Sequence, residues 1–202
     1  TKNHLIVLGI NSSDNVENKN KNLYYNSLVI LNHKLETIYK YNKINLVPFG
    51  EFLPFENFFN NFGIKKITEG YNSFSAGNER EILNLGNLFN EKLILPLICY
   101  EIIYSGKLKK NNQLPDLVIN ISEDAWFGSS IGPYQHFTKA VYRSVEEGVF
   151  IARSANSGIS AFIDPNGRSI KSLKTGESGN ISINFPHFNE PTLFSIYKNW
   201  MK

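Results

Sequence analysis

Two short runs of mainly apolar residues, 92–98 and 116–121, restrict the folds open to this chain of 202 residues. Each run has the length of a β-strand and lacks the polar alternation of a half-exposed strand, as is typical of strands covered on both faces. Such strands occupy the centre of a sheet packed between other layers. With 42% apolar residues the chain can bury such a core, and we expect a single domain over residues 1–202.

The rest of the pattern adds strands and one clear helix. Apolar residues recur at three- and four-residue spacing between Pro133 and Gly148, which predicts a helix there. The polar residues 11–22 and the Phe-rich residues 46–62, which contain Pro and Gly, are predicted to be loops. Together the elements predict an α/β sandwich of two sheets. Further strands are expected at residues 4–10, 23–31, 35–41, 149–152, 158–164, 169–173 and 179–185, with a tight turn at 165–167.

The single cysteine, Cys99, directly follows the first apolar run. If the chain turns from strand to helix after Ile98, the thiol lies at the carboxyl end of a strand, and free helical N–H groups point toward it. Such groups stabilise a thiolate and can bind an oxyanion. A lone cysteine is more often a small buried core residue, so a catalytic role needs support from other residues.

Charged residues that could assist a cysteine nucleophile lie close to Cys99 and in one other short segment. Lys43 and Glu51 lie in residues 41–51, and Glu101 lies two residues after the cysteine. A thiolate that attacks an acyl carbon needs a cation for the developing oxyanion and a carboxylate that moves a proton. Taken singly, Lys43 and Glu51 fit solvated surface positions better.

Several function classes find no support. The net charge of +3 is dispersed, which is not typical of a nucleic-acid surface. No metal and no cofactor is expected, because the four histidines are isolated in the sequence and no phosphate-binding glycine loop occurs. The apolar runs are shorter than the ~20 residues that cross a bilayer. Because the chain begins with Thr and enters a strand almost at once, we expect it to be a piece of a longer protein.

Five ordered motifs resemble the nitrilase superfamily and, within it, the bacterial apolipoprotein N-acyltransferase family. They are residues 41–43 with 46–51, residues 97–101, residues 124–128 with 132–136, the group Arg143, Glu146, Gly148 and Arg153, and residues 155–160. The resemblance covers nearly the whole chain and implies a carbon-nitrogen hydrolase domain with a four-layer αββα sandwich. It also implies a location at the bacterial inner membrane, with the domain facing the periplasm.

The implied reaction takes a fatty acyl chain from a phospholipid donor, through a cysteine thioester, to the N-terminal amine of a diacylglyceryl-cysteine apolipoprotein. By the resemblance Cys99 is the nucleophile, Lys43 stabilises the oxyanion, and Glu51 and Glu101 match further acidic positions. We expect Glu51 to hold Lys43 in an ion pair, because a charged ammonium in a partly dry site needs a counter-charge. The expected oxyanion donor is the backbone N–H of Tyr100. The side chains expected to line the acyl or head-group pocket are Trp126, Phe127, Tyr134 and His136.

The family triad is Glu-Lys-Cys, and its glutamate precedes the strand that residues 5–10 match. We therefore expect the chain to start after this glutamate, without the family's flanking transmembrane helices, and not to turn over by itself. Ser122 stands where the family has asparagine. The loop from Phe52 to Phe62 is expected to contact the membrane, because clustered aromatic side chains in a loop are seldom exposed without a partner.

Three alternatives stay open from the sequence. A soluble amidase would use the same lysine and cysteine, and a truncated, inactive fragment would only bind lipid. A serine hydrolase is suggested by residues 128–132, which fit the G-x-S-x-G pattern around Ser130, with Asp164 and His187 following in the required order. That motif needs a strand before the serine, whereas residues 122–127 are predicted to be a loop.

Overall fold

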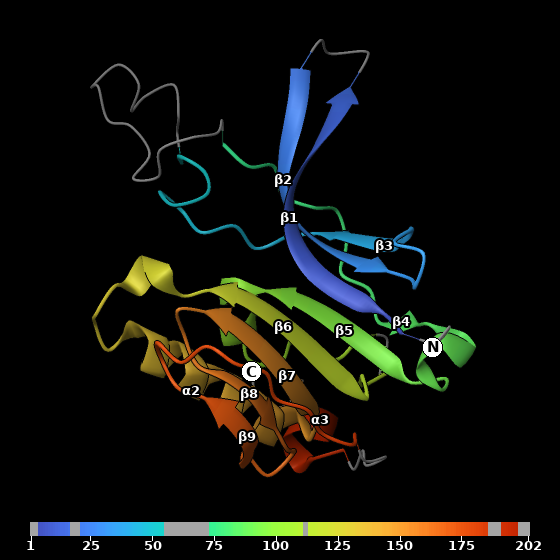
Figure 1. Ribbon diagram of the computed structural model, residues 1–202, viewed down its shortest axis with the longest axis vertical. Coiled ribbons are helices and arrows are strands. Elements are labelled where there is room, and N and C mark those ends of the chain that lie inside the picture. The colour runs from blue at the N-terminus through green and yellow to red at the C-terminus, as the bar shows by residue number, and fades with distance from the viewer. Residues whose placement is uncertain (1–3, 17–20, 55–72, 111–112, 186–190, 198–202) are drawn as a thin grey trace. The chain divides into compact units, whose positions relative to one another are not determined.

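The computed structural model describes residues 4–16, 21–54, 73–110, 113–185 and 191–197 (Figure 1). The chain divides into two compact units, Thr1–Glu79 and Arg80–Lys202. Each unit is built around its own sheet, one of three strands and one of six. The expectation of a single domain stays a prediction.

The first unit is an antiparallel sheet with strand order β1-β2-β3, formed by β1 (Ile6–Val16), β2 (Lys21–Leu31) and β3 (Thr37–Asn42). The buried apolar residues of its strands are 28–30 on the central strand and Tyr41 on β3. The predicted hairpin between β2 and β3 is confirmed, and its turn is closed by Asn32, whose Oδ1 accepts the N–H groups of Lys34 and Glu36.

The loop predicted at residues 11–22 is wrong, because β1 continues to Val16 and pairs with β2 down to Lys21. The described side chains of this extension are mostly exposed. An exposed edge hairpin needs no apolar periodicity, since its backbone ladder supplies the pairing. The predicted loop at 46–62 is irregular over residues 46–54, and residues 55–62 lie outside the described part.

The second unit is a mixed sheet with strand order β4-β5-β6-β7-β8-β9 (Figure 1). The apolar runs form β5 (Leu93–Ile98) and β6 (Leu117–Glu123), which pair in parallel at interior positions as predicted. β7 (Phe150–Asn156) extends the parallel part, and the outer pairs are antiparallel. The outer strands are β4 (Leu83–Asn84), β8 (Ser160–Ile163) and β9 (Ser169–Leu173).

The predicted helix is α2 (Gly132–Glu147), which links β6 to β7 and packs on the sheet through Ala140. Pro133 lies in its first turn, and Gly148 caps its end with a φ of 71°, in the left-handed region that favours glycine. Three short 3₁₀ helices, η2 (Gly86–Phe89), η3 (Cys99–Ile103) and η4 (Ala125–Phe127), and the short α3 (Leu193–Tyr197) complete the described helices.

Residues 179–185, predicted to be a strand, are irregular, so that prediction is wrong. The segment is held by side chains instead: Lys171 Nζ donates to the Ser182 carbonyl at 2.7 Å, and the Phe185 ring packs edge-on against Phe150. Across the described parts of the chain, no helix combines the length and the hydropathy that a bilayer crossing needs.

Candidate active site

Cys99 lies at a sharp turn where β5 ends and η3 begins. The predicted passage from strand to helix is confirmed, with a 3₁₀ helix that starts at the cysteine itself. Cys99 has φ of 51°, in the left-handed region that residues with a Cβ seldom adopt. Holding such a residue there costs about 1–3 kcal/mol, so the surrounding structure must enforce the conformation.

Glu101 fixes this turn from within η3. Its side chain is fully buried, and its Oε2 accepts the backbone N–H of Ile98 at 2.9 Å. Its Oε1 accepts a hydrogen bond from Arg80 Nη2 at 3.0 Å, which balances the buried charge. The predicted acidic residue next to the nucleophile is therefore engaged with the backbone of the turn.

The topology brings a second group of polar residues to the same edge of the sheet as Cys99. Parallel strands β5 and β6 end there, and Asp124 directly follows β6. Register pairs Asn120 of β6 with Arg153 of β7, which places their side chains side by side on one face. His136 joins them from the first turns of α2.

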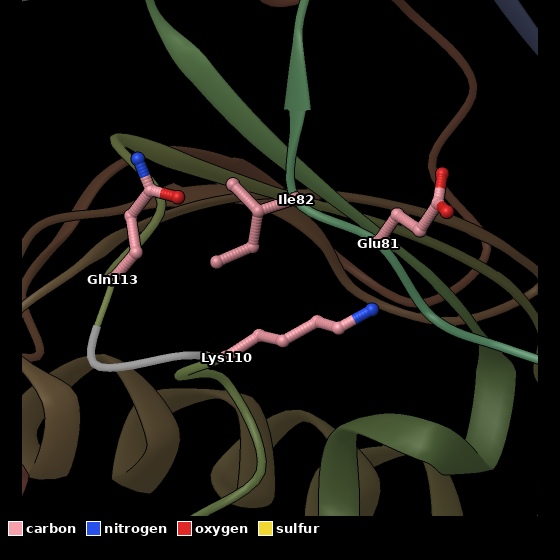
Figure 2. Close-up of a pocket in the computed structure, with 4 residues that line it drawn as sticks. All are labelled: Glu81, Ile82, Lys110 and Gln113. Carbon is pink, nitrogen blue, oxygen red and sulfur yellow. The ribbon is translucent and has the colours of Figure 1, made fainter.

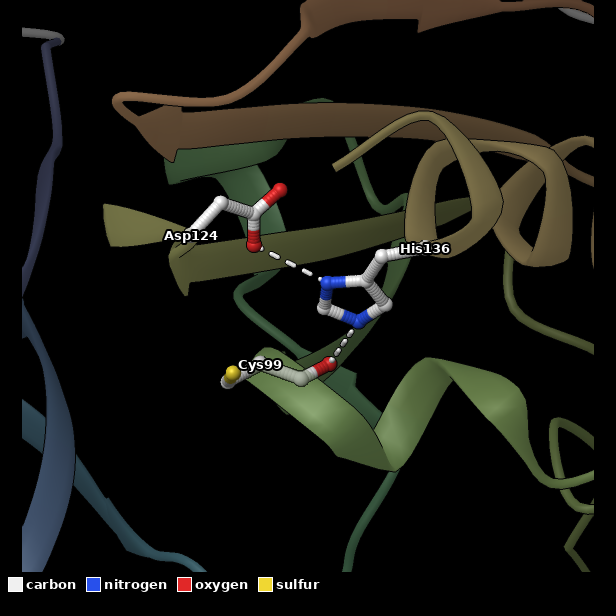
Figure 3. Close-up of side chains that lie close together, drawn as sticks. All are labelled: Cys99, Asp124 and His136. Carbon is white, nitrogen blue, oxygen red and sulfur yellow. Dashed lines mark hydrogen bonds and ion pairs between the residues drawn. The ribbon is translucent and has the colours of Figure 1, made fainter. Parts of the chain in front are cut away.

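These residues form hydrogen bonds around the Cys99 carbonyl (Figure 3). His136 Nε2 lies 3.3 Å from the Cys99 oxygen, and its Nδ1 lies 2.9 Å from Asp124 Oδ1. Asn120 Nδ2 also donates to the Cys99 oxygen, at 3.4 Å. Arg153 connects the other ends, because its Nη2 donates to Asp124 Oδ2 at 2.7 Å and its Nη1 donates to Asn120 Oδ1.

The charges in this group balance each other inside the protein, where Asp124, His136 and Arg153 are almost fully buried. Burial alone would raise the pKa of Asp124, but the hydrogen bonds from His136 and Ser122 and the charge of Arg153 outweigh it and hold the pKa below its usual value. Burial lowers the pKa of Arg153, against the opposing effect of Asp124.

Ligand atoms of Cys99, Asp124 and His136 lie within 4.8 Å of one another, a spacing that could suit a metal ion. The donor set does not fit one, because the position already has a cation. The guanidinium of Arg153 donates to Asp124 and lies 3.2 Å from His136 Nδ1. A metal ion there would have to compete with this guanidinium for the Asp124 carboxylate.

Aromatic side chains surround His136 at this site. The Tyr100 and Phe127 rings lie 6.2 and 5.7 Å from the imidazole, centroid to centroid. Gly132 makes the Phe127 position possible, since a Cβ at residue 132 would come within 2.5 Å of that ring. Trp126 and Tyr134 are 64% and 54% exposed, whereas His136 is buried, so the predicted pocket residues differ widely in their access to solvent.

Lys43 and Glu51, in the first unit, form the expected ion pair at 2.7 Å. Lys43 is 1% exposed, so the interpretation as a solvated lysine is wrong. Glu51 is held in turn by hydrogen bonds from Asn26 Nδ2 and the Val47 backbone N–H, each at 2.8 Å. The pair is therefore a preorganised buried cation with its counter-ion.

The structure thus gathers the predicted site residues in two groups. Lys43 and Glu51 belong to the first unit, and the remaining seven belong to the second. No role was predicted for Asp124, Asn120 or Arg153. A signal for Asn120 was its amide within the otherwise apolar run 116–121, and one for Arg153 was its guanidinium directly after the apolar residues 149–152.

Two other features of the second unit carry no comparable chemistry. Residues 128–132 follow a 3₁₀ helix and no strand, so the serine-hydrolase turn predicted by that motif is not formed; His187 lies outside the described residues. An open hollow elsewhere in the unit is lined by Glu81, Ile82, Lys110 and Gln113 (Figure 2).

Sequence comparison matches residues 1–185 to a family described as carbon-nitrogen hydrolase. A curated relative from Bradyrhizobium diazoefficiens, named apolipoprotein N-acyltransferase, is 40% identical over 171 residues, or 85% of this chain. One of the same name from Rickettsia typhi is 38% identical over 200 residues, or 97% of the chain. The chain spans only 31% and 38% of the length of these relatives.

Structure comparison finds an amidase from Nesterenkonia sp. AN1. A mutant of it, with the acetamide moiety of fluoroacetamide added covalently at its active-site cysteine, gives a TM-score of 0.59 at 14% identity, covering 98% of this chain and 68% of that chain. Another mutant of the amidase, described as a nitrilase-superfamily protein, gives 0.57. The mixed α/β fold predicted from the resemblance is confirmed at this level.

Proposed function

The chain belongs to the carbon-nitrogen hydrolase family, and from this premise we propose that it supplies the cysteine and the lysine of an apolipoprotein N-acyltransferase. The observation that carries the proposal is the 40% identity to relatives of that name over most of the chain. The amidases share the fold at 14% identity and favour no substrate class.

In the proposed reaction the Cys99 thiolate attacks the ester carbonyl of a phospholipid. A carbon–sulfur bond forms, the ester carbon–oxygen bond breaks, and the lysophospholipid leaves as an alcohol that carries the proton lost by the Cys99 thiol. The N-terminal amine of a diacylglyceryl-cysteine apolipoprotein then attacks the thioester, so that an amide forms and the thiol is released. Splitting one difficult transfer into two steps is the usual gain of covalent catalysis.

Lys43 and the Tyr100 backbone N–H stabilise the oxyanion in this proposal, and Glu51 holds Lys43 in place through their ion pair. The buried Lys43–Glu51 pair supports the first role, because a fixed cation in a dry site needs no reorganisation during the reaction. The exposed Trp126 and Tyr134 support contact with the acyl chain or head group. Phe127 and His136 are proposed to line the inner part of that pocket.

The proposal includes a four-layer αββα sandwich and a place at the bacterial inner membrane, with the domain facing the periplasm. The phospholipid donor and the apolipoprotein acceptor are the proposed partners. Membrane contact through residues 52–62 belongs to the proposal as well, with residues 55–62 outside the described part of the chain.

Intact-mass spectrometry of the full-length protein after incubation with phospholipid tests the proposal. We expect an increase in mass by one acyl group, located on Cys99 by peptide mapping and absent from Cys99→Ala. An adduct that persists in Cys99→Ala, or that maps to Ser130, would contradict the assignment. Hydrolysis of small amides without any phospholipid acylation would favour the amidase alternative.

A further inference from the structure

Five residues form a closed ring of hydrogen bonds that holds the nucleophile by its backbone. The ring runs from the Cys99 oxygen to His136, then through Asp124, Arg153 and Asn120, and back to the Cys99 oxygen. Apart from Cys99, all members are buried. Both hydrogen bonds from the ring to Cys99 end on its carbonyl oxygen, and Figure 3 shows the one from His136.

The hydrogen bond to the carbonyl oxygen engages the His136 nitrogen that lies nearest to Cys99. A carbonyl oxygen can only accept, so the hydrogen bond to Cys99 requires a hydrogen on Nε2. The other ring nitrogen, Nδ1, faces Asp124 Oδ1 at 2.9 Å and Arg153 Nη2 at 3.2 Å. Figure 3 shows the sulfur on the opposite side of Cys99 from the carbonyl that the imidazole contacts.

The consequence lies in the peptide group that joins Cys99 to Tyr100. This group is planar and trans, so its C=O and N–H point in opposite directions. Gripping the Cys99 oxygen therefore fixes the direction of the Tyr100 N–H, which is the oxyanion donor of the proposed function. The same two hydrogen bonds help to hold Cys99 at its left-handed φ, a conformation that residues with a Cβ seldom adopt.

We propose that His136 and Asp124 are positioning residues that aim the Tyr100 N–H at the oxyanion by holding the carbonyl of the same peptide group. His136 makes the contact, and Asp124 orients the imidazole. Arg153 ties Asp124 to Asn120, so that both donors to the Cys99 oxygen belong to one rigid unit. The effect on catalysis rests on the proposed acyl transfer. The hydrogen bonds that hold the Cys99 carbonyl oxygen do not depend on it.

Two substitutions of His136 distinguish the contribution of Nε2, which contacts Cys99, from that of Nδ1, which contacts Asp124. The amide of His136→Gln can still donate to the Cys99 oxygen, because its nitrogen takes the place of Nε2. The shorter amide of His136→Asn can reach Asp124 but not Cys99. His33→Asn, at an exposed histidine in the first unit, is the matched control.

Two reactions of Cys99 distinguish the positioning of the Tyr100 N–H from activation of the thiol. Both are measured in the full-length protein, with any cysteine outside residues 1–202 replaced by serine. Acylation passes through an oxyanion, whereas alkylation by iodoacetamide does not. We expect His136→Asn to slow single-turnover acylation by phospholipid about ten- to a hundredfold and alkylation by no more than about twofold. His136→Gln should recover most of the lost acylation rate, and His33→Asn should match the wild type.

A third measurement reports the grip itself. Because Cys99 is the single cysteine of the chain, ¹³C-carbonyl cysteine labels one peptide group within it. We expect its resonance to move upfield in His136→Asn, as for a carbonyl that loses a hydrogen bond, and to stay near the wild-type position in His136→Gln and His33→Asn.

Parallel losses of acylation and alkylation in His136→Asn, or a His136→Gln variant that acylates a hundredfold more slowly than the wild type, would overturn the proposal. The second criterion applies even if His136→Asn does not fold. If the wild type reacts with p-nitrophenyl acetate but not with phospholipid, the proposed function fails, and the ester replaces phospholipid in the comparison. An unchanged Cys99 carbonyl resonance in folded His136→Asn would show that His136 does not hold the carbonyl, whether or not the proposed function is correct.

Discussion

The buried carboxylate of Asp124 makes the stability of the protein depend on pH in a defined direction. Its partners hold the pKa in the folded protein below the ordinary value of 3.8. A carboxyl group with a lowered pKa stabilises the folded state above its unfolded pKa, and this contribution disappears as the pH falls through the folded pKa. The contribution of Asp124 is therefore complete at pH 6 and is lost below about pH 4.

We predict that Asp124→Asn lowers the free energy of unfolding by about 3–5 kcal/mol at neutral pH, because it leaves Arg153 buried without its counter-charge. The difference from the wild type should shrink as the pH falls from about 5 to 3. Urea unfolding at several pH values measures it. Asp14→Asn, which removes an exposed pair with Lys40, should change stability little at any pH; a difference for Asp124→Asn that does not vary with pH would contradict the prediction.

Residues differ in how far their environment could be predicted from the sequence. The Lys43–Glu51 pair was predicted because the two residues lie in one short segment and a buried cation needs a counter-charge. The Asp124–Arg153 pair was not, because it joins residues that are far apart in the sequence. Their meeting depends on the register between β6 and β7, which local pattern does not encode.

At the scale of elements, the connection between β7 and β8 constrains the site through Gly158. A Cβ at this residue would lie 2.3 Å from Asp124 Oδ2, closer than any real contact. We predict that Gly158→Ala destabilises the protein by about 1–3 kcal/mol and slows acylation of Cys99, because Asp124 must move away from His136 or Arg153.

Thermal unfolding and single-turnover acylation measure the two effects. Gly179→Ala is the control, since its added Cβ would meet only the flexible side chain of Leu173, at 3.3 Å. Stability and acylation equal to those of the wild type in Gly158→Ala would show that the connection can shift freely, contrary to the geometry described.

Elements that bury many apolar side chains were the easiest to predict. β5, β6 and α2 lie where the apolar runs and the helical spacing placed them, because burial leaves a strong pattern in the sequence. The far half of the β1–β2 hairpin was missed, since strands exposed to solvent need no such pattern. The prediction of a strand at 179–185 was wrong for the opposite reason. Apolar and polar residues alternate there as in a strand, but no neighbouring backbone pairs with the segment among the described residues.

At the scale of the whole molecule, the proposed reaction uses a lysine of the first unit and a cysteine of the second. We predict that Lys43→Met slows acylation of Cys99 by about two to three powers of ten, through loss of the oxyanion cation. Alkylation by iodoacetamide should change far less, because it forms no oxyanion. Lys43→Arg should recover little, since a planar guanidinium places its charge differently.

Lys40→Met removes a lysine of the same sheet from an exposed pair with Asp14 and serves as the control. Single-turnover kinetics and circular dichroism follow the chemistry and the fold. Acylation by a folded Lys43→Met protein at the rate of the Lys40→Met control would show that the buried ion pair has only a structural role.

The sequence motifs predicted the family and the mixed α/β class, because both depend on local signals repeated along the whole chain. The ring around Cys99 could not be predicted in this way. Its residues lie in η3, in β6 and directly after it, in α2 and in β7, and only the folded topology brings these elements together.

The ring contacts residue 99 through its main-chain oxygen alone, so the shape of the turn does not depend on the thiol. Alanine at position 99 would keep the carbonyl, its two donors and the direction of the following N–H, while removing the atom that reacts. Cys99→Ala is therefore more than an inactive control. It should keep the turn geometry of the wild type without reacting, which makes it suited to binding an intact acyl donor for structure determination.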